Sequence, residues 1–389
     1  MRIHTVRKGE TIAKIAEEYG IREEQLREIN GDLKGKAALG EDLLILCPTR
    51  THTAREDDTI ERICLRYRIR KNDILTLNPE IREEKIKAGK TIVLKYDERT
   101  HGMAVTNGYI YKGCTVESLS SALPFITYAT FVCRAKRGDT TAPIFCEDEL
   151  LEAVARGGKI PLLKIYGDTD FNAGTKDDAL RFYDGVIAYA KQKGFRGIVL
   201  NSVPYKNSAE YYSSLLIELR KRMIGSDLIL ITECDDKTPF VFNDLSDGSV
   251  LTYTKLWDSE IPSFNDGEKT VISNFACEAE STKTFIELPA FARLGNGFVD
   301  INEAIITARN RGLEIKGNAD TLLSEFETSK GMCLYPNLKN EKAVLELLSK
   351  YGYMGISFDV MRTPRVFLKM YNAMYKTAYA TGITAPDGC

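Results

Sequence analysis

The first 96 residues contain one sequence unit written twice. His4-Thr5-Val6, Thr11-Ile12 and Tyr19 return 48 residues later as His52-Thr53-Ala54, Thr59-Ile60 and Tyr67. After a slip of one residue, the run from Gly40 to Ile45 returns as Gly89 to Leu94. Similarity at a fixed period indicates a duplicated supersecondary unit. We therefore expect two small modules, at residues 1–48 and 49–96, and a larger domain at 97–389.

The pattern within each module predicts the order β-α-α-β. In the first copy, Thr5-Val6 is typical of a strand end, and Gly9-Glu10-Thr11 is typical of a turn followed by a helix cap. Ile12, Ile15 and Tyr19 then fall on one helical face, which Gly20 ends. A second helix is predicted from about 22 to 29, and a closing strand at 43–46.

The composition argues against several classes of function. The chain has 389 residues, a formal charge of -2 and no basic block, so a nucleic-acid partner is not expected. No apolar run is long enough to span a membrane, and the start of the chain has no signal-peptide pattern. The nine cysteines form no C-x-x-C pair, so we predict free thiols and neither a metal nor a cofactor. An exposed Cys389 could form an intermolecular bridge.

The duplicated unit resembles the LysM module, in the stretch from Thr5 to Ile12, in Tyr19-Gly20, in Ile29-Asn30 and in Gly40. The resemblance implies binding of N-acetylglucosamine polymers, which are peptidoglycan or chitin, in a groove between the loop after the first strand and the loop before the second. Two linked modules would gain avidity. The second copy departs from the family at Asp57, where a glycine is usual, so its turn is expected to differ. The implied glycan-binding residues are Gly9, Glu10, Thr11, Ile12, Ile29 and Asn30 in the first copy, and Asp58, Thr59, Ile60, Leu77, Asn78 and Pro79 in the second.

Beyond residue 100, short apolar runs alternate with amphipathic helical patterns. This alternation predicts an α/β fold, a (β/α)₈ TIM barrel at about 100–383, with functional residues at the C-terminal strand ends. The amphipathic stretches include 147–156, 177–193, 209–223 and 342–351. The eight predicted strands are 103–109, 126–132, 162–166, 197–201, 228–232, 250–254, 285–288 and 354–358.

The barrel resembles glycoside hydrolase family 18, and in particular the bacterial spore-cortex N-acetylglucosaminidases, which also carry two N-terminal LysM modules. The matching segments are Asn107-Gly108-Tyr109, 123–128, 193–198, Leu251-Thr252-Tyr253 and 353–356. A small inserted hairpin at about 322–335 lies between strands seven and eight, where that family has one. The resemblance covers essentially the whole chain.

The carboxylates of the family are missing from the fourth strand. Family 18 enzymes carry D-G-x-D-x-D-x-E there, and alternate residues point into the barrel. The glutamate protonates the glycosidic oxygen, and the aspartate two residues earlier orients the acetamide of the substrate as the nucleophile. The corresponding positions of this chain are Val199, Asn201 and Val203. Loss of a general acid alone removes about 10²–10⁴-fold in rate, so hydrolysis by this route is not expected.

Other acids and aromatic residues could still form a site at the barrel mouth. Glu233, Glu287 and Asp359 follow or end strands and could replace the missing acid, although we favour the interpretation that they are solvated or paired rim carboxylates. Tyr253 and Phe358 match the acetamide-contacting tyrosine and the sugar-platform tryptophan of the family, although both could be barrel filling. The predicted cleft residues are Asn107, Tyr109, Asn201, Tyr253 and Phe358.

These patterns lead to one main hypothesis and one alternative. The first is a peptidoglycan-binding protein of the bacterial spore envelope, made in the mother-cell cytoplasm and deposited on the spore coat or cortex, with an inactive barrel. Spore coat proteins are further partners in this hypothesis. The alternative is an active cortex-lytic N-acetylglucosaminidase with a relocated acid. An intracellular regulatory barrel has no positive support in the sequence.

Overall fold

A computed structural model of the chain describes most of its residues. The described residues are 1–31, 36–78, 81, 86–96, 101–135, 147–167, 176–200, 209–234, 245–252, 261–278 and 280–377. Asn201, Val203, Tyr253, Pro79, Cys146 and Cys389 lie outside them, so the predictions for these residues stay predictions.

The first module has the predicted β-α-α-β order. Strand β1 (Arg2–Thr5) pairs antiparallel with β2 (Asp42–Ile45), and helices α1 (Ile12–Glu18) and α2 (Glu23–Ile29) connect them. Thr11 begins α1, because its side chain accepts a hydrogen bond from the Lys14 amide. The small core contains Val6, Ile12, Ile15, Leu26 and Leu43.

The second module repeats this arrangement. Strands β3 (Pro48–Thr53) and β4 (Thr91–Tyr96) pair antiparallel around helices α3 (Ile60–Tyr67) and α4 (Lys71–Leu77). Thr59 caps α3 through the Arg62 amide, as Thr11 caps α1. The sequence period is therefore also a structural period, and the prediction of two β-α-α-β modules is confirmed.

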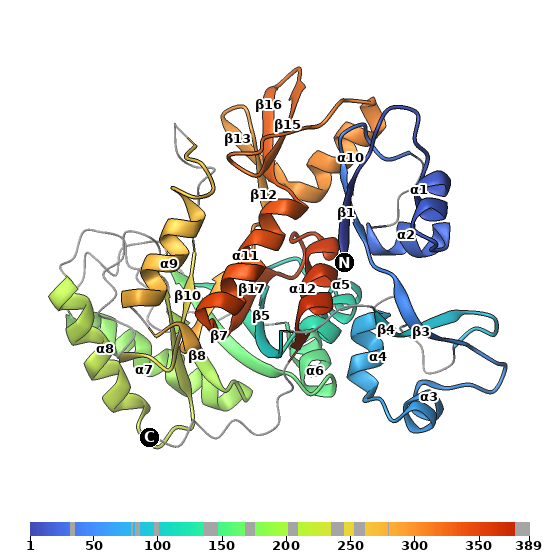
Figure 1. Ribbon diagram of the computed structural model, residues 1–389. Coiled ribbons are helices and arrows are strands. Elements are labelled where there is room, and N and C mark those ends of the chain that lie inside the picture. The colour runs from blue at the N-terminus through green and yellow to red at the C-terminus, as the bar shows by residue number, and fades with distance from the viewer. Residues whose placement is uncertain are drawn as a thin grey trace.

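The larger domain is a closed parallel barrel of eight strands, which confirms the predicted fold (Figure 1). Each strand pairs with the next, and the last one, β17 (Gly355–Asp359), closes the barrel on the first, β5 (Met103–Ile110). The strands between them are β6 (Tyr128–Ala135), β7 (Ile160–Gly167), β8 (Gly197–Leu200), β9 (Ile229–Cys234), β10 (Gly248–Leu251) and β11 (Thr284–Glu287).

Helices surround the barrel. They are α5 (Val116–Ala122), the 3₁₀ turn η1 (Leu123–Phe125), α6 (Asp148–Arg156), α7 (Lys176–Lys193), α8 (Ala209–Met223), α9 (Glu268–Glu278), α11 (Leu338–Tyr351) and α12 (Arg365–Met374). Their apolar faces and the outward side chains of the strands form the main hydrophobic core. A short strand, β18 (Lys376–Thr377), pairs with β5.

The insertion between the seventh and eighth barrel strands is larger than the predicted hairpin. That hairpin is β15 (Leu323–Thr328) and β16 (Gly331–Pro336), within the predicted range. It belongs to a five-stranded antiparallel sheet that also contains β12 (Phe291–Leu294), β13 (Gly297–Asp300) and β14 (Lys316–Gly317). Helix α10 (Ile301–Arg311) follows β13, so the insertion is a small α+β unit.

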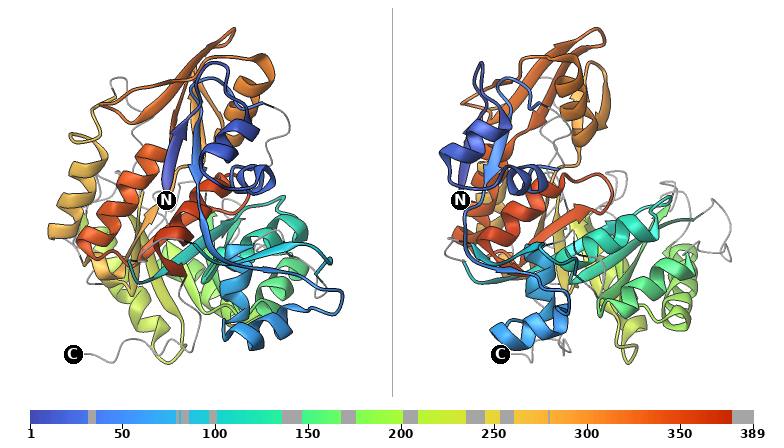
Figure 2. Two further views of the ribbon diagram at one scale, coloured as in Figure 1. Left: turned by 45° about the vertical axis from the view of Figure 1, so that its right-hand side comes forward. Right: turned by 90° about the vertical axis from the view of Figure 1, so that its right-hand side faces the viewer.

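The first module packs against this insertion (Figure 2). The Ile315 amide donates a hydrogen bond to the Leu39 carbonyl at 2.8 Å. Arg309 of α10 donates to both carboxylate oxygens of Glu41, and both side chains are largely buried, at 15% and 5% exposure. Lys339 of α11 pairs with Asp42 at 3.2 Å. The first module is therefore held to the barrel domain by several charged and backbone contacts.

The described residues contain no helix that is long and apolar enough to cross a membrane. The seven cysteines among them are free thiols: Cys47, Cys64, Cys114, Cys133, Cys234, Cys277 and Cys333.

Candidate glycan loops and barrel mouth

A histidine links the first strand of each module to the loop that follows it. In the first module, His4 Nε2 lies 2.9 Å from Glu10 Oε2, and His4 Nδ1 lies 3.1 Å from the Tyr19 hydroxyl. A carboxylate can only accept, so Nε2 carries the proton and donates to Glu10. In the neutral imidazole, Nδ1 then accepts from the Tyr19 hydroxyl. The same Glu10 oxygen accepts from the Arg7 amide at 2.7 Å. The Arg7 amide and then His4 hold the pKa of Glu10 below its usual value.

The second module builds the same network with a shorter acid. His52 lies 2.7 Å from Asp58 Oδ2 and 2.9 Å from the Tyr67 hydroxyl. The Arg55 amide donates to Asp58 at 2.8 Å, and this bond is the main reason that the pKa of Asp58 is lowered. Glu10 and Asp58 are therefore occupied in fixing the loop, which is a different role from the predicted contact with glycan.

The turn between these groups differs between the modules, as the sequence predicted. Both turns close with a backbone hydrogen bond of 3.2 Å, from Glu10 to Arg7 and from Asp58 to Arg55. Gly9 has a φ of 83°, the left-handed value that the third residue of a type II turn requires. Asp57 has no positive φ. Aspartate at this position is therefore accommodated by a different turn.

Asn30 and Asn78 were predicted to bind glycan, but their side chains are used inside the modules. Asn30 donates to the Leu26 and Leu44 carbonyls and accepts from the Leu44 amide. Asn78 makes the equivalent bonds to Ile74 and Val93. Both are buried, and both hydrogens of each amide are engaged. The prediction is corrected here: these residues fasten the second helix of each module to its closing strand.

Two other predicted groove residues belong to the module cores. Ile12 and Ile60 are at most 4% exposed, and each packs in the core of its own module. Thr11 and Thr59 cap the first helices through their side chains. The part of the predicted groove that remains accessible is the loop around Gly9 and Thr11, with Thr59 in the second module.

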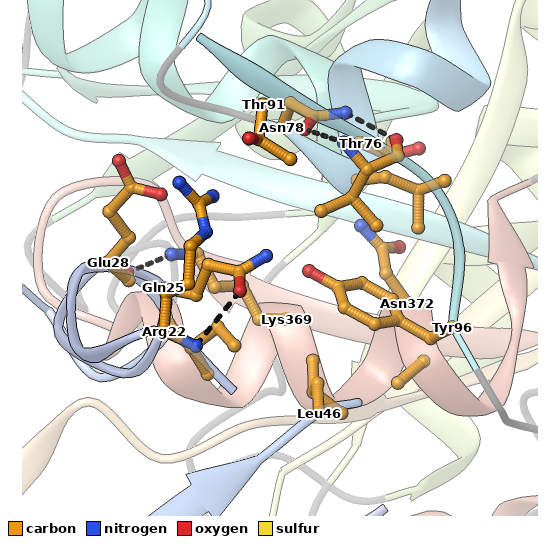
Figure 3. A pocket seen from close by; sticks show the side chains of 14 residues that line it. Arg22, Gln25, Glu28, Leu46, Thr76, Asn78, Thr91, Tyr96, Lys369 and Asn372 are labelled. Atoms are coloured by element: carbon orange, nitrogen blue, oxygen red, sulfur yellow. Dashed lines mark hydrogen bonds between the residues drawn. The ribbon is translucent and has the colours of Figure 1, made fainter. Parts of the chain in front are cut away.

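Ile29 and Leu77 both line a cavity at the junction of the two modules. Figure 3 shows this cavity from close by. There α2 and α4 meet helix α12 of the barrel, and Lys369 of α12 donates to the Glu28 carbonyl. The cavity at this junction has a volume of about 30 Å³, which is room for a water molecule but not for a sugar ring. Ile29 and Leu77 therefore serve packing between the modules.

The interior of the barrel changes from apolar to polar toward its C-terminal end. An apolar layer contains Leu162, Val199, Ile231 and Phe285. Side chains two residues further along a strand point to the same face. Lys164, Glu233 and Glu287 accordingly follow Leu162, Ile231 and Phe285 into the mouth. Val199 is fully buried in the apolar layer, so the first inward position of the family motif holds a valine.

Glu233 is held by two neighbours. Its Oε1 accepts from Lys164 Nζ and from the Tyr109 hydroxyl, both at 2.6 Å. Lys164 also lies over the Tyr109 ring, 4.8 Å from its centre. All three side chains are buried, and burial raises the pKa of Tyr109. Glu233 is therefore a paired carboxylate, which agrees with the interpretation of these acids as paired rim carboxylates. Tyr109 adds a second hydrogen bond to this pair.

Asp359 is also engaged. Its Oδ1 accepts from the amides of Met361 and Arg362, and its Oδ2 accepts from the Arg362 guanidinium at 2.9 Å. Arg362 lies 5.6 Å from the centre of the Tyr111 ring. Asp359 consequently shapes the turn after β17.

Glu287 is the candidate acid with no hydrogen-bond partner among the described residues, and it keeps part of its surface exposed. Burial by the surrounding barrel, together with the nearby Glu233 charge, raises its pKa to about 7. Glu287 therefore differs from Glu233 and Asp359 in having neither a hydrogen-bond partner nor an ion-pair partner in the described part of the chain.

Of the remaining predicted cleft residues, Asn107 faces the barrel interior and Phe358 does not. Asn107 faces the barrel interior, where it accepts from Thr130 at 2.6 Å and donates to Ser357 at 3.0 Å. Phe358 is fully buried in the outer core between barrel and helices. Its neighbour Ser357 faces inward, so alternation turns Phe358 away from the mouth. The prediction of Phe358 as a sugar platform is therefore wrong.

The sequence reasoning missed three functional groups. His4 and His52 mark the repeat, but each also precedes an acid and a tyrosine at the same spacing in both copies. This spacing indicates the hydrogen-bond network of the loop. Lys164 lies in an otherwise apolar strand run, where a lysine is unusual and indicates a buried ion pair.

Comparison with known proteins agrees with this architecture. The LysM domain family matches residues 4–39 and 52–95. Among curated proteins, none is similar to this chain in sequence. Among solved structures, the spore cortex-lytic enzyme SleL of Bacillus cereus is similar over 97% of this chain and 99% of its own, with a TM-score of 0.72 and 16% identity. The Bacillus megaterium SleL gives a TM-score of 0.73, with 14% identity over 97% and 98%.

The barrel alone is also similar to solved chitinases. The GH18 chitinase from Cycas revoluta aligns over 69% of this chain and 99% of its own, with a TM-score of 0.57 and 16% identity. These likenesses establish the fold of the larger domain. The chain thus consists of two LysM domains followed by a (β/α)₈ barrel with the fold of the GH18 chitinases.

Proposed function

We propose that this protein binds peptidoglycan through its two LysM modules and does not cleave it by the substrate-assisted route of family 18. The observation that carries the binding half of the proposal is the repeated loop. Each module holds the loop after its first strand in place with a histidine, a carboxylate and a tyrosine in the same relationship. A fixed loop loses little conformational entropy when it binds a ligand.

The barrel half of the proposal rests on Val199. The residue fills an inward position of the motif with an aliphatic side chain that is completely buried. Hydrolysis by the family route also needs an orienting aspartate and a proton donor at positions 201 and 203, where the sequence has Asn and Val. An amide cannot supply the negative charge that stabilises a developing oxazolinium ion, and a valine cannot donate a proton.

We further propose that the ligand is peptidoglycan of the bacterial spore envelope. The support is that the two similar structures spanning nearly the whole chain are both spore cortex-lytic enzymes. In this proposal the protein is made in the mother cell, deposited on the spore coat or cortex, and in contact with coat proteins.

The test is an incubation of the purified chain with cortex peptidoglycan. Pelleting of the protein and release of reducing ends are measured in the same sample, alongside the double variant Asn201→Asp/Val203→Glu. Pelleting without release supports the proposal. Protein that stays in the supernatant contradicts the binding half.

Glu287 supports a second candidate function, an N-acetylglucosaminidase with a relocated acid. Its carboxyl group faces the barrel mouth, lacks a hydrogen-bond partner in the described residues and has a pKa of about 7, the range that suits a general acid. If this candidate is correct, the unmodified chain releases reducing ends, and Glu287→Gln abolishes the release. Glu325→Gln, on the inserted sheet, is the matched control and should leave the release unchanged.

A further inference from the structure

The loop of the second module carries an interaction that the first module lacks. Arg62 Nη1 donates to the Asp57 carbonyl oxygen at 2.7 Å and to Asp57 Oδ2 at 2.9 Å. One guanidinium group therefore holds both the backbone and the side chain of the turn residue. The loop carbonyl of the second module already has a hydrogen-bond donor.

The equivalent positions in the first module are Gly9 and Lys14, each 48 residues earlier. Gly9 is exposed, and a Cβ built on it would meet nothing within 4 Å. The side chain of Lys14 makes no hydrogen bond or ion pair with any described residue, and the Gly9 carbonyl accepts none from that part of the chain. The first loop therefore presents a backbone carbonyl that is free to accept a hydrogen bond, whereas the corresponding carbonyl of the second loop already accepts one from Arg62.

We propose that the two modules are unequal glycan sites, and that Asp57 and Arg62 form a latch that weakens the second one. This inference rests on the proposed glycan binding. A sugar hydroxyl can donate to the free Gly9 carbonyl and approach the backbone closely, because glycine has no side chain there. In the second module the same approach has to displace Arg62 from the Asp57 carbonyl.

The turn itself adds to this difference. A type II turn with a left-handed third residue and a turn without one differ in the orientation of their central peptide group. Lys8–Gly9 and Glu56–Asp57 therefore present their backbone polar groups to a ligand in different directions. The residue at this position thus affects glycan binding in two ways. It sets the type of turn in both modules, and as Asp57 it also forms the latch in the second module.

The size of the effect follows from the exposure of the pair. Arg62 and Asp57 are 59% and 75% exposed, and exposed pairs are weak. We expect the latch to lower the affinity of the second module by a factor of about 2–5.

The experiment exchanges the two positions between the modules of the intact protein. Asp57→Gly/Arg62→Lys opens the second loop, and Gly9→Asp/Lys14→Arg places the latch residues in the first. Arg62→Met alone removes the latch without changing the turn. Lys71→Met, which removes the exposed pair with Glu61 on the same module, is the matched control. Each protein is titrated calorimetrically with a soluble pentamer of N-acetylglucosamine.

The unmodified protein should show one stronger and one weaker site. The opening variant should strengthen the weaker site about 2- to 5-fold, Arg62→Met should produce part of this gain, and the closing variant should weaken the stronger site by a similar factor. Two equal sites in the unmodified protein, or exchanges without effect, would overturn the inference and leave the proposed function intact. Absence of binding by every protein, including the opening variant, would overturn both.

Discussion

Gly40 of the first module lies directly against Ile315 of the inserted sheet. A Cβ built on Gly40 would come within 1.8 Å of the Ile315 carbonyl oxygen, which no packing adjustment of side chains can relieve. The neighbouring Leu39 carbonyl accepts the Ile315 amide. Close approach of two backbones at this point therefore seats the first module on the barrel domain.

Substitution of Gly40 by alanine should detach the first module from the insertion. Gly40 and its counterpart Gly89 have φ values of 80° and 83°, so alanine costs about 1–2 kcal/mol of strain at either position. Only Gly40 also meets a clash, because Gly89 has nothing within 4 Å. Gly40→Ala should accelerate hydrogen exchange of the Ile315 amide, and Gly89→Ala should not. Equal exchange in both variants would show that the contact does not depend on Gly40.

Removal of Lys164 should destabilise the barrel. The substitution Lys164→Met leaves the buried Glu233 with the Tyr109 hydroxyl as its remaining donor in the described part of the chain, and loss of one partner of a buried pair costs about 3–5 kcal/mol. Replacing both, in Lys164→Met/Glu233→Gln, should recover much of this loss, because no uncompensated charge remains. Denaturant unfolding of the barrel, followed by aromatic circular dichroism, measures both changes. A single variant as stable as the parent would contradict the pairing.

The unfolding free energy should fall as the pH rises toward 8. Burial, with the Glu268 charge nearby, raises the pKa of Glu341 to about 8, and neither of its carboxyl oxygens has a hydrogen-bond partner among the residues that the structure describes. The folded state therefore keeps a proton that the unfolded state releases near pH 4.5, so stability is lost as pH rises through this window. Between pH 6 and 8.5 the loss at this group is roughly 2 kcal/mol.

The variant Glu341→Gln isolates this contribution, because glutamine resembles the protonated acid and does not titrate. Unfolding measured at both pH values should show a smaller loss in the variant than in the parent. Identical pH profiles would mean that Glu341 is not protonated in the folded chain.

The regular periodicity of the sequence allowed the fold to be predicted. The site was harder to predict, because its side chains are paired with residues that are distant in the sequence. The eight barrel strands appear as short apolar runs because both of their faces are buried, as in β7, where only Lys164 interrupts the pattern. The inserted sheet was underestimated, because β12 and β13 are four residues each, and strands this short give only a weak alternating pattern.

Errors at the site arose from side-chain orientation. Asn30 and Asn78 occupy a position that the LysM resemblance assigns to glycan binding. The sequence alone does not show that backbone groups of β2 and β4 use all the hydrogen-bonding capacity of these side-chain amides. Phe358 was assigned to the wrong face, and a shift of one residue in a strand reverses every side chain. The latch between Asp57 and Arg62 required the geometry of the turn, which the sequence left open.

The most direct test of the account measures binding and cleavage of peptidoglycan in one sample. Purified chain is mixed with insoluble cortex peptidoglycan, and the pelleted fraction and the released reducing ends are determined over the same time course. We predict saturable pelleting with no release above that of peptidoglycan alone. Release that grows with time and disappears in Glu287→Gln would contradict the claim that the protein binds peptidoglycan without cleaving it.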